Sequence, residues 1–154
     1  MFEFTVRGAR DAAERGELDD WVHEFLTTDG LGTNLPMATG LRLQPRWWLG
    51  PLRVPLASLN RICGPEPDMP YRTTSNAWDE RVSAIMAAAI DLEALPPLIL
   101  EYTEAGLQLC DGNHRHEALR RLGEEAAWAI VWCNSEEHHR SIRGTGSYWA
   151  STDG

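Results

Sequence analysis

The spacing of apolar residues along the chain predicts two amphipathic helices. Between Leu18 and Leu26 the apolar positions recur at the i, i+3, i+4, i+7, i+8 spacing of one buried helix face. Gly16 is expected to separate this helix from a shorter helical turn at residues 11–15. A second helix begins at Ser75 or Asn76, either of which can cap it, and ends before Pro96. Its predicted buried face consists of Trp78, Val82, Ile85, Met86, Ala89 and Ile90.

Other segments have the two-residue period or the continuous apolar run of strands. Residues 52–59 alternate as a half-buried strand, and Pro55 places that strand at a sheet edge. Residues 98–102 and 107–110 predict a hairpin with its turn at 103–106, and residues 126–133 predict a buried strand. A short helix is expected at 114–122, ended by Gly123, and a last one that Ser135 caps, running to about residue 143. Residues 27–36 have the composition of a loop.

This order of elements predicts an α/β or α+β fold with a small mixed sheet. A chain of 154 residues is long enough for one domain with its own core. We expect residues 1–50 to form a helical extension packed on the domain of residues 51–143. Residues 144–154 are expected to be a loosely ordered tail, although Tyr148 and Trp149 lie in it.

The charge balance argues against a nucleic-acid ligand. Asp and Glu total 23 against 14 basic residues, which gives a net charge of −9, and every basic residue is Arg. Proteins that bind DNA normally carry a basic face, so DNA is not an expected partner. The absence of Lys excludes mechanisms that need a phosphate-loop or Schiff-base Lys. The three cysteines form no C-x-x-C pair, and no apolar run approaches the ~20 residues of a membrane span, so we expect a cytoplasmic protein.

The segment 107–123, LQLCDGNHRHEALRRLG, carries the clearest chemical signal. A predicted strand leads into Asp111 and Gly112, and a helix starts at once, so free backbone amides at a helix N-terminus offer an anion site. Helical spacing puts Arg115 on the inward face with Ala118 and Leu119. A buried guanidinium needs a partner, which is either Asp111 or a bound anion such as phosphate. A simple turn in which Asp111 and Arg115 pair only with each other remains the alternative.

The histidines and the remaining aromatic residues favour structural roles. His114 and His116 are two residues apart on a helix and point to nearly opposite sides, which disfavours one metal ion between them. His138 and His139 are expected to be solvated. Trp47, Trp48 and Tyr71 are expected to cover the core or the surface and not to stack on bases.

The string DGNHRHEALRRLG, followed by the strand AWAIVWC, resembles the signature of the ParB/sulfiredoxin superfamily. Its members carry a strand, then D-G-x-H-R or G-E-R-R, then a helix ending in Leu-Gly. The upstream segments RVPLASL, DERVSAIMAAAI and LPPLILEY resemble the preceding elements of that family, so the resemblance covers about residues 52–134. It implies a compact ParB/sulfiredoxin-like fold whose small mixed sheet is flanked by helices.

Within the superfamily, the motif is most similar to that of the free serine kinases, which read D-G-H-H-R. Sulfiredoxins have a catalytic Cys directly before the motif His, where this chain has Asn113, and Cys110 lies on the other side of Asp111. A sulfinic acid reductase is therefore not expected. Partition ParB proteins add a helix-turn-helix domain and a dimerisation tail, for which this chain is too short and too acidic.

The serine kinase branch implies a Mg²⁺-dependent phosphotransferase that acts on a small hydroxyl-bearing molecule. Its nucleotide is a di- or triphosphate, ATP or ADP before CTP. Phosphoryl transfer needs donors and a cation around the phosphates and a carboxylate for the acceptor proton. In this chain the resemblance implies Glu66 as that base, with Asp68 second. The motif residues then contact phosphate or metal: Asp111, Gly112, Asn113, His114 and Arg115.

In that assignment Asp111 holds the metal or the motif, and Gly112 and Asn113 contact phosphate through their backbone. His114 and Arg115 neutralise the charge of the transferred group. The competing hypothesis is a ParB-like nucleotide switch, or a nuclease-type module associated with DNA, without small-molecule kinase activity.

Overall fold

The computed structural model describes residues 2–28 and 33–144, which form six α-helices, two short 3₁₀ turns and six strands. The elements, in chain order, are α1 (Val6–Glu14), α2 (Leu18–Thr27), α3 (Leu35–Leu41), β1 (Trp47–Pro55), η1 (Leu56–Ser58), β2 (Cys63–Gly64), β3 (Tyr71–Arg72), α4 (Ser75–Ala88), η2 (Leu92–Ala94), β4 (Leu98–Thr103), β5 (Gly106–Asp111), α5 (Asn113–Arg121), β6 (Ala126–Cys133) and α6 (Glu136–Arg143). The predicted tail beyond residue 144, with Tyr148 and Trp149, lies outside the described residues.

The main sheet has the strand order β1-β6-β4-β5, with β4 and β6 parallel and the other two pairs antiparallel. The predicted hairpin is β4–β5, and the predicted buried strand is β6, which has the predicted bounds. Pro55 ends β1 at the sheet edge, as predicted. However, β1 starts at Trp47 instead of residue 52, because a register shift between Leu49 and Leu52 interrupts the alternation on which the prediction rested.

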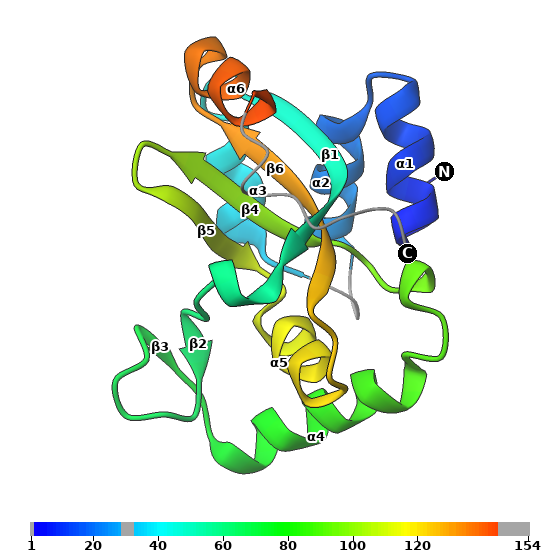
Figure 1. The fold of residues 1–154 in the computed structure, drawn as a ribbon, viewed down its shortest axis with the longest axis vertical. Coiled ribbons are helices and arrows are strands. Elements are labelled where there is room, and N and C mark those ends of the chain that lie inside the picture. Colours follow the sequence, from blue (N-terminus) through cyan, green and yellow to red (C-terminus); the bar gives the residue numbers. More distant parts are fainter. Residues whose placement is uncertain (1, 29–32, 145–154) are drawn as a thin grey trace.

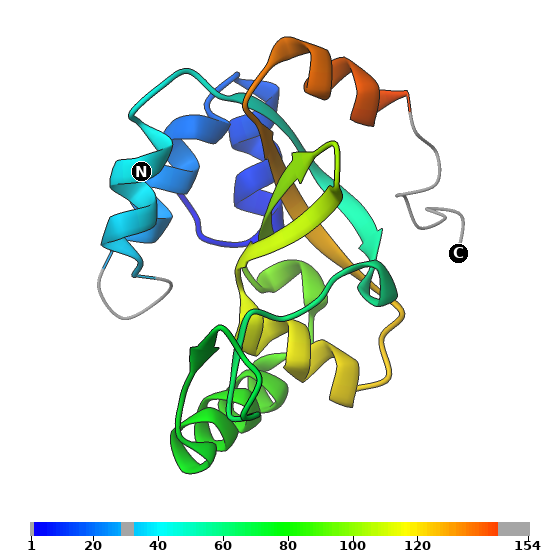
Figure 2. The ribbon, with the colours of Figure 1, turned by 90° about the vertical axis from the view of Figure 1, so that its left-hand side faces the viewer.

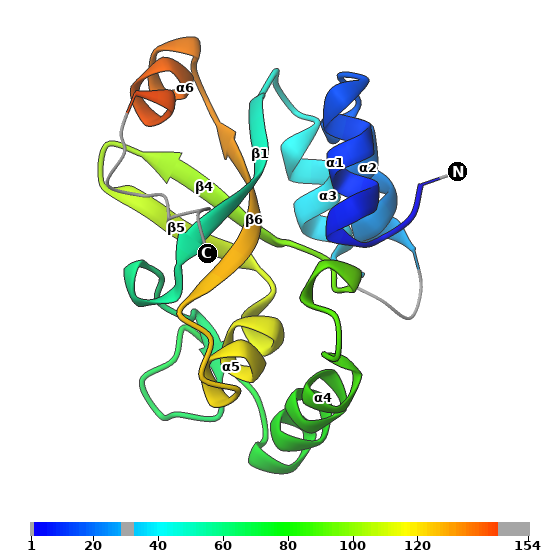
Figure 3. The same cartoon turned by 45° about the vertical axis from the view of Figure 1, so that its right-hand side comes forward.

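Helices cover both faces of the sheet (Figure 1, Figure 3). Helices α1, α2 and α3 lie against one face, where Ile99, Ile130 and Trp132 join their apolar side chains in one core cluster. On the other face, Leu119 of α5 and Ile142 of α6 pack with Leu100, Val131 and their neighbours. The class is therefore a mixed α/β fold, as the order of elements predicted.

The N-terminal segment follows its pattern in α2 and departs from it in α3. The five predicted core residues of α2, Leu18 to Leu26, are all buried. The predicted loop at 27–36 is partly wrong, because α3 already begins at Leu35. Asn34 caps that helix by accepting a hydrogen bond from the backbone N–H of Met37. Residues 29–32 of the predicted loop lie outside the described part of the chain.

Helix α4 packs on α5 and not on the sheet, as Figure 2 shows at the foot of the molecule. Trp78 and Val82 are its buried residues, and they meet Ala118 of α5. The predicted face extends too far: the helix ends at Ala88, and Ile90 is 95% exposed. Ile85 and Met86 are partly buried against this cluster, whereas Ala89 and Ile90 lie beyond the last turn of the helix. The capping position is Thr74, one residue before the predicted one.

The structure describes no helix long and apolar enough to cross a membrane. Cys63, Cys110 and Cys133 are free thiols, in agreement with the absence of a disulfide pattern.

Candidate functional site

The motif forms a tight turn between β5 and α5. Asp111 ends the strand, Gly112 has a φ of 105°, and Asn113 starts the helix. A Cβ atom at Gly112 would lie 2.6 Å from Cδ2 of Leu98 and 2.9 Å from Nη2 of Arg115. Both the left-handed backbone and the close packing therefore require glycine. Gly112 has no side chain to cap α5, so the first amides of the helix are left for a ligand.

Arg115 points inward, as its helical spacing predicted, and is 8% exposed. Its Nη2 donates to the backbone oxygen of Pro97 at 3.1 Å and to Oδ2 of Asp111 at 3.3 Å. The guanidinium carbon lies 5.4 Å from the ring centroid of Phe25. Burial lowers the pKa of Arg115, and Asp111 opposes that shift.

The predicted pair with Asp111 does not satisfy the whole guanidinium. Its Nε is buried and has no hydrogen-bond partner among the described residues. Buried donors are nearly always paired, so this N–H group is available to a ligand or a water molecule. An anion in the adjoining cleft is one partner that would suit a cation.

Asn113 fixes the motif to the segment before β2. Its Oδ1 accepts hydrogen bonds from the backbone N–H groups of Ile62 at 2.8 Å and Cys63 at 3.1 Å. The side-chain oxygen is thus occupied, and the backbone amide of Asn113 stays the group that we predict to contact phosphate.

His114 stacks on an aromatic ring of α4. The ring centroids of His114 and Trp78 are 4.4 Å apart, and the guanidinium of Arg61 lies 4.8 Å from the centroid of Trp78. Burial, together with the charges of Arg81, Arg115 and Arg61, lowers the pKa of His114 to about 4. His114 is therefore neutral at pH 7 and can donate a hydrogen bond to phosphate, but it does not bring the positive charge that we expected of it.

Glu66 lies in the loop between β2 and β3, where its carboxylate forms an ion pair with Arg61. The hydrogen bond from Arg61 lowers the pKa of Glu66. The structure thus brings residues 111–115 together, whereas Glu66 reaches them only through Arg61 and Trp78. Asp68, the second candidate base, is exposed.

The motif faces a cleft of about 680 Å³, here called the motif chamber. Residues 111–115 line it, α4 contributes Arg81 and Ile85, and Thr33, Asn34, Pro36 and Met37 also belong to its wall. Glu66 is not among the residues that line it. Sequence reasoning missed Arg81 and the segment 33–37, since neither belongs to a motif or to a periodic pattern that points at the site.

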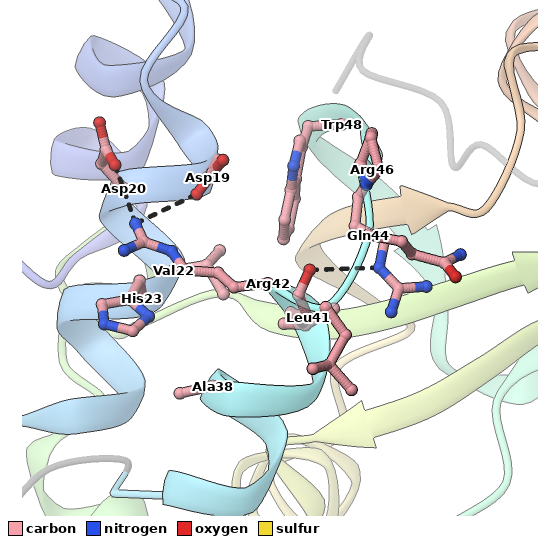
Figure 4. Close-up of a pocket in the computed structure, with 12 residues that line it drawn as sticks. Asp19, Asp20, Val22, His23, Ala38, Leu41, Arg42, Gln44, Arg46 and Trp48 are labelled. Carbon is pink, nitrogen blue, oxygen red and sulfur yellow. Dashed lines mark hydrogen bonds and ion pairs between the residues drawn. The ribbon is translucent and has the colours of Figure 1, made fainter.

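A second cavity, of about 560 Å³, lies between α2, α3 and β1 and is drawn in Figure 4. Its charged side chains already have protein partners. Arg42 donates to Asp19 and Asp20, and Arg46 donates to the backbone oxygens of Leu41 and Gly40. This cavity therefore offers less to an ionic ligand than the motif chamber.

Among the described residues, no group of three His, Cys, Asp or Glu side chains is placed to hold a metal ion. His114 and His116 point apart, as predicted, and Nε2 of His116 lies 3.4 Å from the backbone oxygen of Leu56. The expectation that His138 and His139 are solvated is wrong. Because α6 packs on the sheet, His139 Nε2 lies 3.0 Å from the backbone oxygen of Trp48, and His138 meets the ring of Tyr102.

Comparison with known proteins gives likenesses at the level of the fold. No protein-family model matches the chain, and a search of curated proteins finds no match either. Among solved structures, sulfiredoxin from Arabidopsis thaliana is similar over 64% of this chain and 99% of its own, with 18% identity and a TM-score of 0.43. The chromosome-partitioning protein ParB from Caulobacter crescentus, complexed with CTP-γ-S, is similar over 64% of this chain and 50% of its own, with 18% identity and a TM-score of 0.38.

Both TM-scores are below 0.5, so these likenesses carry no argument, and the superfamily resemblance that the motif gave stays a prediction. The mixed α/β class rests on the structure itself. Neither neighbour is a serine kinase, so the predicted relation to that branch is not tested. Likenesses with these TM-scores carry no information about activity.

Proposed function

We propose that the motif chamber binds the phosphates of a nucleoside di- or triphosphate and that the protein transfers a phosphoryl group to a small hydroxyl-bearing molecule. The observation that carries this proposal is the meeting, at one chamber, of the open N-terminus of α5 and the buried guanidinium of Arg115 with its unpartnered Nε. Helix N-termini and guanidinium groups are two of the commonest phosphate ligands in proteins. The chamber volume lies within the range of small-molecule sites.

Each motif residue has a separate role in this proposal. The backbone amides of Gly112 and Asn113 donate to phosphate oxygens, and neutral His114 donates a further hydrogen bond. Arg115 supplies the positive charge that opposes the charge on the transferred group.

Asp111 is the residue that would hold Mg²⁺, and its surroundings fit that ion. Mg²⁺ in nucleotide sites is typically bound by one or two protein carboxylates, with phosphate oxygens and waters as its remaining ligands. Asp111 is the carboxylate that lines the motif chamber among the described residues. The ion would neutralise phosphate charge next to Arg115.

In the transfer step, the acceptor hydroxyl oxygen attacks the terminal phosphorus. The bond from this phosphorus to the bridging oxygen breaks, and the nucleotide leaves with the electron pair. The hydroxyl proton passes to a carboxylate, for which we propose Glu66, with Asp68 as the second candidate. Glu66 does not line the chamber, but the strands on either side of its loop do, through Cys63 of β2 and Tyr71 of β3. Because Arg61 holds the carboxylate and lowers its pKa, Glu66 acts as a base only when that ion pair opens.

The proposal is tested by thermal shift with ATP, ADP, GTP and CTP, with and without Mg²⁺, followed by phosphorus NMR with a panel of hydroxyl compounds. A nucleotide that binds only the folded state raises the melting temperature. If no nucleotide at millimolar concentration raises the melting temperature, the proposed phosphate site is wrong. A shift with CTP alone, with DNA-stimulated dimerisation and no turnover, would support the ParB-like switch in place of a phosphotransferase.

A further inference from the structure

The motif chamber adjoins a third cavity, of about 430 Å³, here called the side chamber. The two share Thr33, Arg81, Ile85 and Arg115 in their walls. Beyond these residues the side chamber is bounded by Phe25, Leu95 and Pro96. Two guanidinium groups therefore stand where the chambers meet.

This arrangement separates the two molecules of a phosphoryl transfer. The attacking and leaving oxygens lie roughly in line, on opposite sides of the transferred group. The transferred phosphoryl group needs positive charge around it, so we place this group between Arg81 and Arg115. The nucleotide and the acceptor then lie in different chambers. Asp111 lines the motif chamber, as do Cys63 of β2 and Tyr71 of β3, the strands on either side of the loop that carries Glu66. The acceptor hydroxyl would therefore lie in the motif chamber, and the nucleoside would extend into the side chamber.

The part of the motif chamber away from the phosphates has an uncharged lining. Its side chains come from Pro36, Met37, Ile62, Cys63, Tyr71 and Cys110. Cys63 and Cys110 are free thiols. The amide of Asn34 is occupied, because its Oδ1 accepts from the backbone N–H of Met37.

Among the described residues, the charged side chains that line this chamber are Asp111, Arg81 and Arg115, all assigned to the phosphates and the metal. A free amino acid would bring an ammonium and a carboxylate beside its hydroxyl. Neither charge would meet an oppositely charged side chain in this part of the lining, so a zwitterion gains no ion pair there.

Resting on the proposed function, we propose that the acceptor is a neutral alcohol or phenol with an apolar body and not a free amino acid. The apolar body packs against Met37 and Ile62, and its hydroxyl points toward Asp111. This substrate class differs from that of the serine kinases that the motif resembles.

Binding tests the proposal without any need for turnover. Saturation-transfer NMR on the full chain, with ADP and Mg²⁺ present, compares 2-phenylethanol with L-serine as probes. Binding of 2-phenylethanol at least tenfold tighter than that of L-serine is expected. Tighter binding of L-serine, or binding of neither probe at 20 mM, would overturn the acceptor class.

A pair of variants on α3 locates the probe. Met37→Gln replaces a thioether of the lining by an amide of similar length and should weaken 2-phenylethanol binding about fivefold. Leu35→Gln is the matched control, because Leu35 is on the same helix, is 55% exposed and does not line the chamber. Equal binding by Met37→Gln and the wild type would also overturn the assignment of the chamber.

Turnover distinguishes this inference from the proposed function. If 2-phenylethanol binds as expected but phosphorus NMR shows no transfer to any compound, the chamber is a site for neutral apolar ligands. The proposal that the protein is a phosphotransferase is then wrong. If L-serine is phosphorylated in preference to 2-phenylethanol, the phosphotransferase stands and the acceptor class fails.

Discussion

Replacing Arg115 by Met tests the phosphate site most directly, because it removes the charge and keeps most of the length of the side chain. The substitution also breaks the ion pair with Asp111, whose side chain is 15% exposed. Removing one partner of a buried pair costs about 3 kcal/mol or more, since the remaining charge is left uncompensated. For a chain of this size that loss lowers the melting temperature by roughly 6–12 °C in the absence of ligand.

The ligand effect has to be separated from this loss of stability. A nucleotide at one hundred times its dissociation constant stabilises the wild type by about 2.7 kcal/mol, which raises the melting temperature by roughly 5–11 °C. In Arg115→Met this rise should disappear. The double variant Asp111→Asn/Arg115→Met removes both charges, so it should regain most of the lost stability while still failing to respond to nucleotide.

The assay is differential scanning fluorimetry of the wild type, Asp111→Asn, Arg115→Met and the double variant, with EDTA present so that no metal effect enters. Arg143→Met serves as an exposed arginine control on α6. Asp111→Asn should keep the nucleotide shift under these conditions. A wild-type rise in melting temperature on adding nucleotide to the double variant would refute the argument. The phosphates would then bind without Arg115, the arginine that α5 directs inward.

Three further outcomes follow from the same geometry. Glu66→Gln should lower turnover by about 10²- to 10⁴-fold in phosphorus NMR while the nucleotide-induced rise in melting temperature persists; full turnover in Glu66→Gln would exclude Glu66 as the base, and Asp68→Asn then tests the second candidate. The hydrogen bond from Arg120 lowers the pKa of buried Glu117 to about 2 from an ordinary value near 4.5, so its stabilisation is complete above pH 4.5 and is lost as the pH falls toward 2. Acid titration followed by circular dichroism should show that Glu117→Gln flattens this dependence, and an unchanged slope would contradict it. Duplex DNA should bind with a dissociation constant on the order of 10⁻⁴ M or poorer at physiological salt, and submicromolar binding in fluorescence polarisation would revive the DNA-associated alternative.

The sequence predicted those helices and strands best whose apolar residues follow one regular spacing over the whole element. The strand β6 is an unbroken apolar run, and α2 places its five apolar residues on one face, so both were predicted closely. In contrast, α3 contains Pro36 and Gly40, and just two of its residues, Ala38 and Leu41, are buried. A helix of seven residues with so short an apolar stripe has no signal that separates it from a loop.

In the candidate site, contacts between residues close in the sequence could be predicted, whereas contacts between distant residues could not. The direction of Arg115 follows from its helical spacing to Ala118 and Leu119, and its pair with Asp111 joins residues only four apart across the turn from β5 to α5. The ring of Trp78 beside His114 and the ring of Phe25 beside Arg115 come from positions 36 and 90 residues away in the chain. No periodicity links such distant positions, so the neutral state of His114 could not be predicted from its neighbours in the sequence.

Net charge and local charge also lead to different conclusions about ligands. The whole chain carries −9, which opposes an extended polyanion such as DNA. The motif chamber nevertheless gathers two guanidinium groups and one carboxylate from the described residues, and the amides of α5 add their partial positive charge. A nucleotide meets mainly this local field, because charges beyond about 8–10 Å are screened at physiological salt. On the proposed function, Arg81 and Arg115 in the motif chamber would favour a small phosphate ester, while the net charge of the whole chain opposes a nucleic acid.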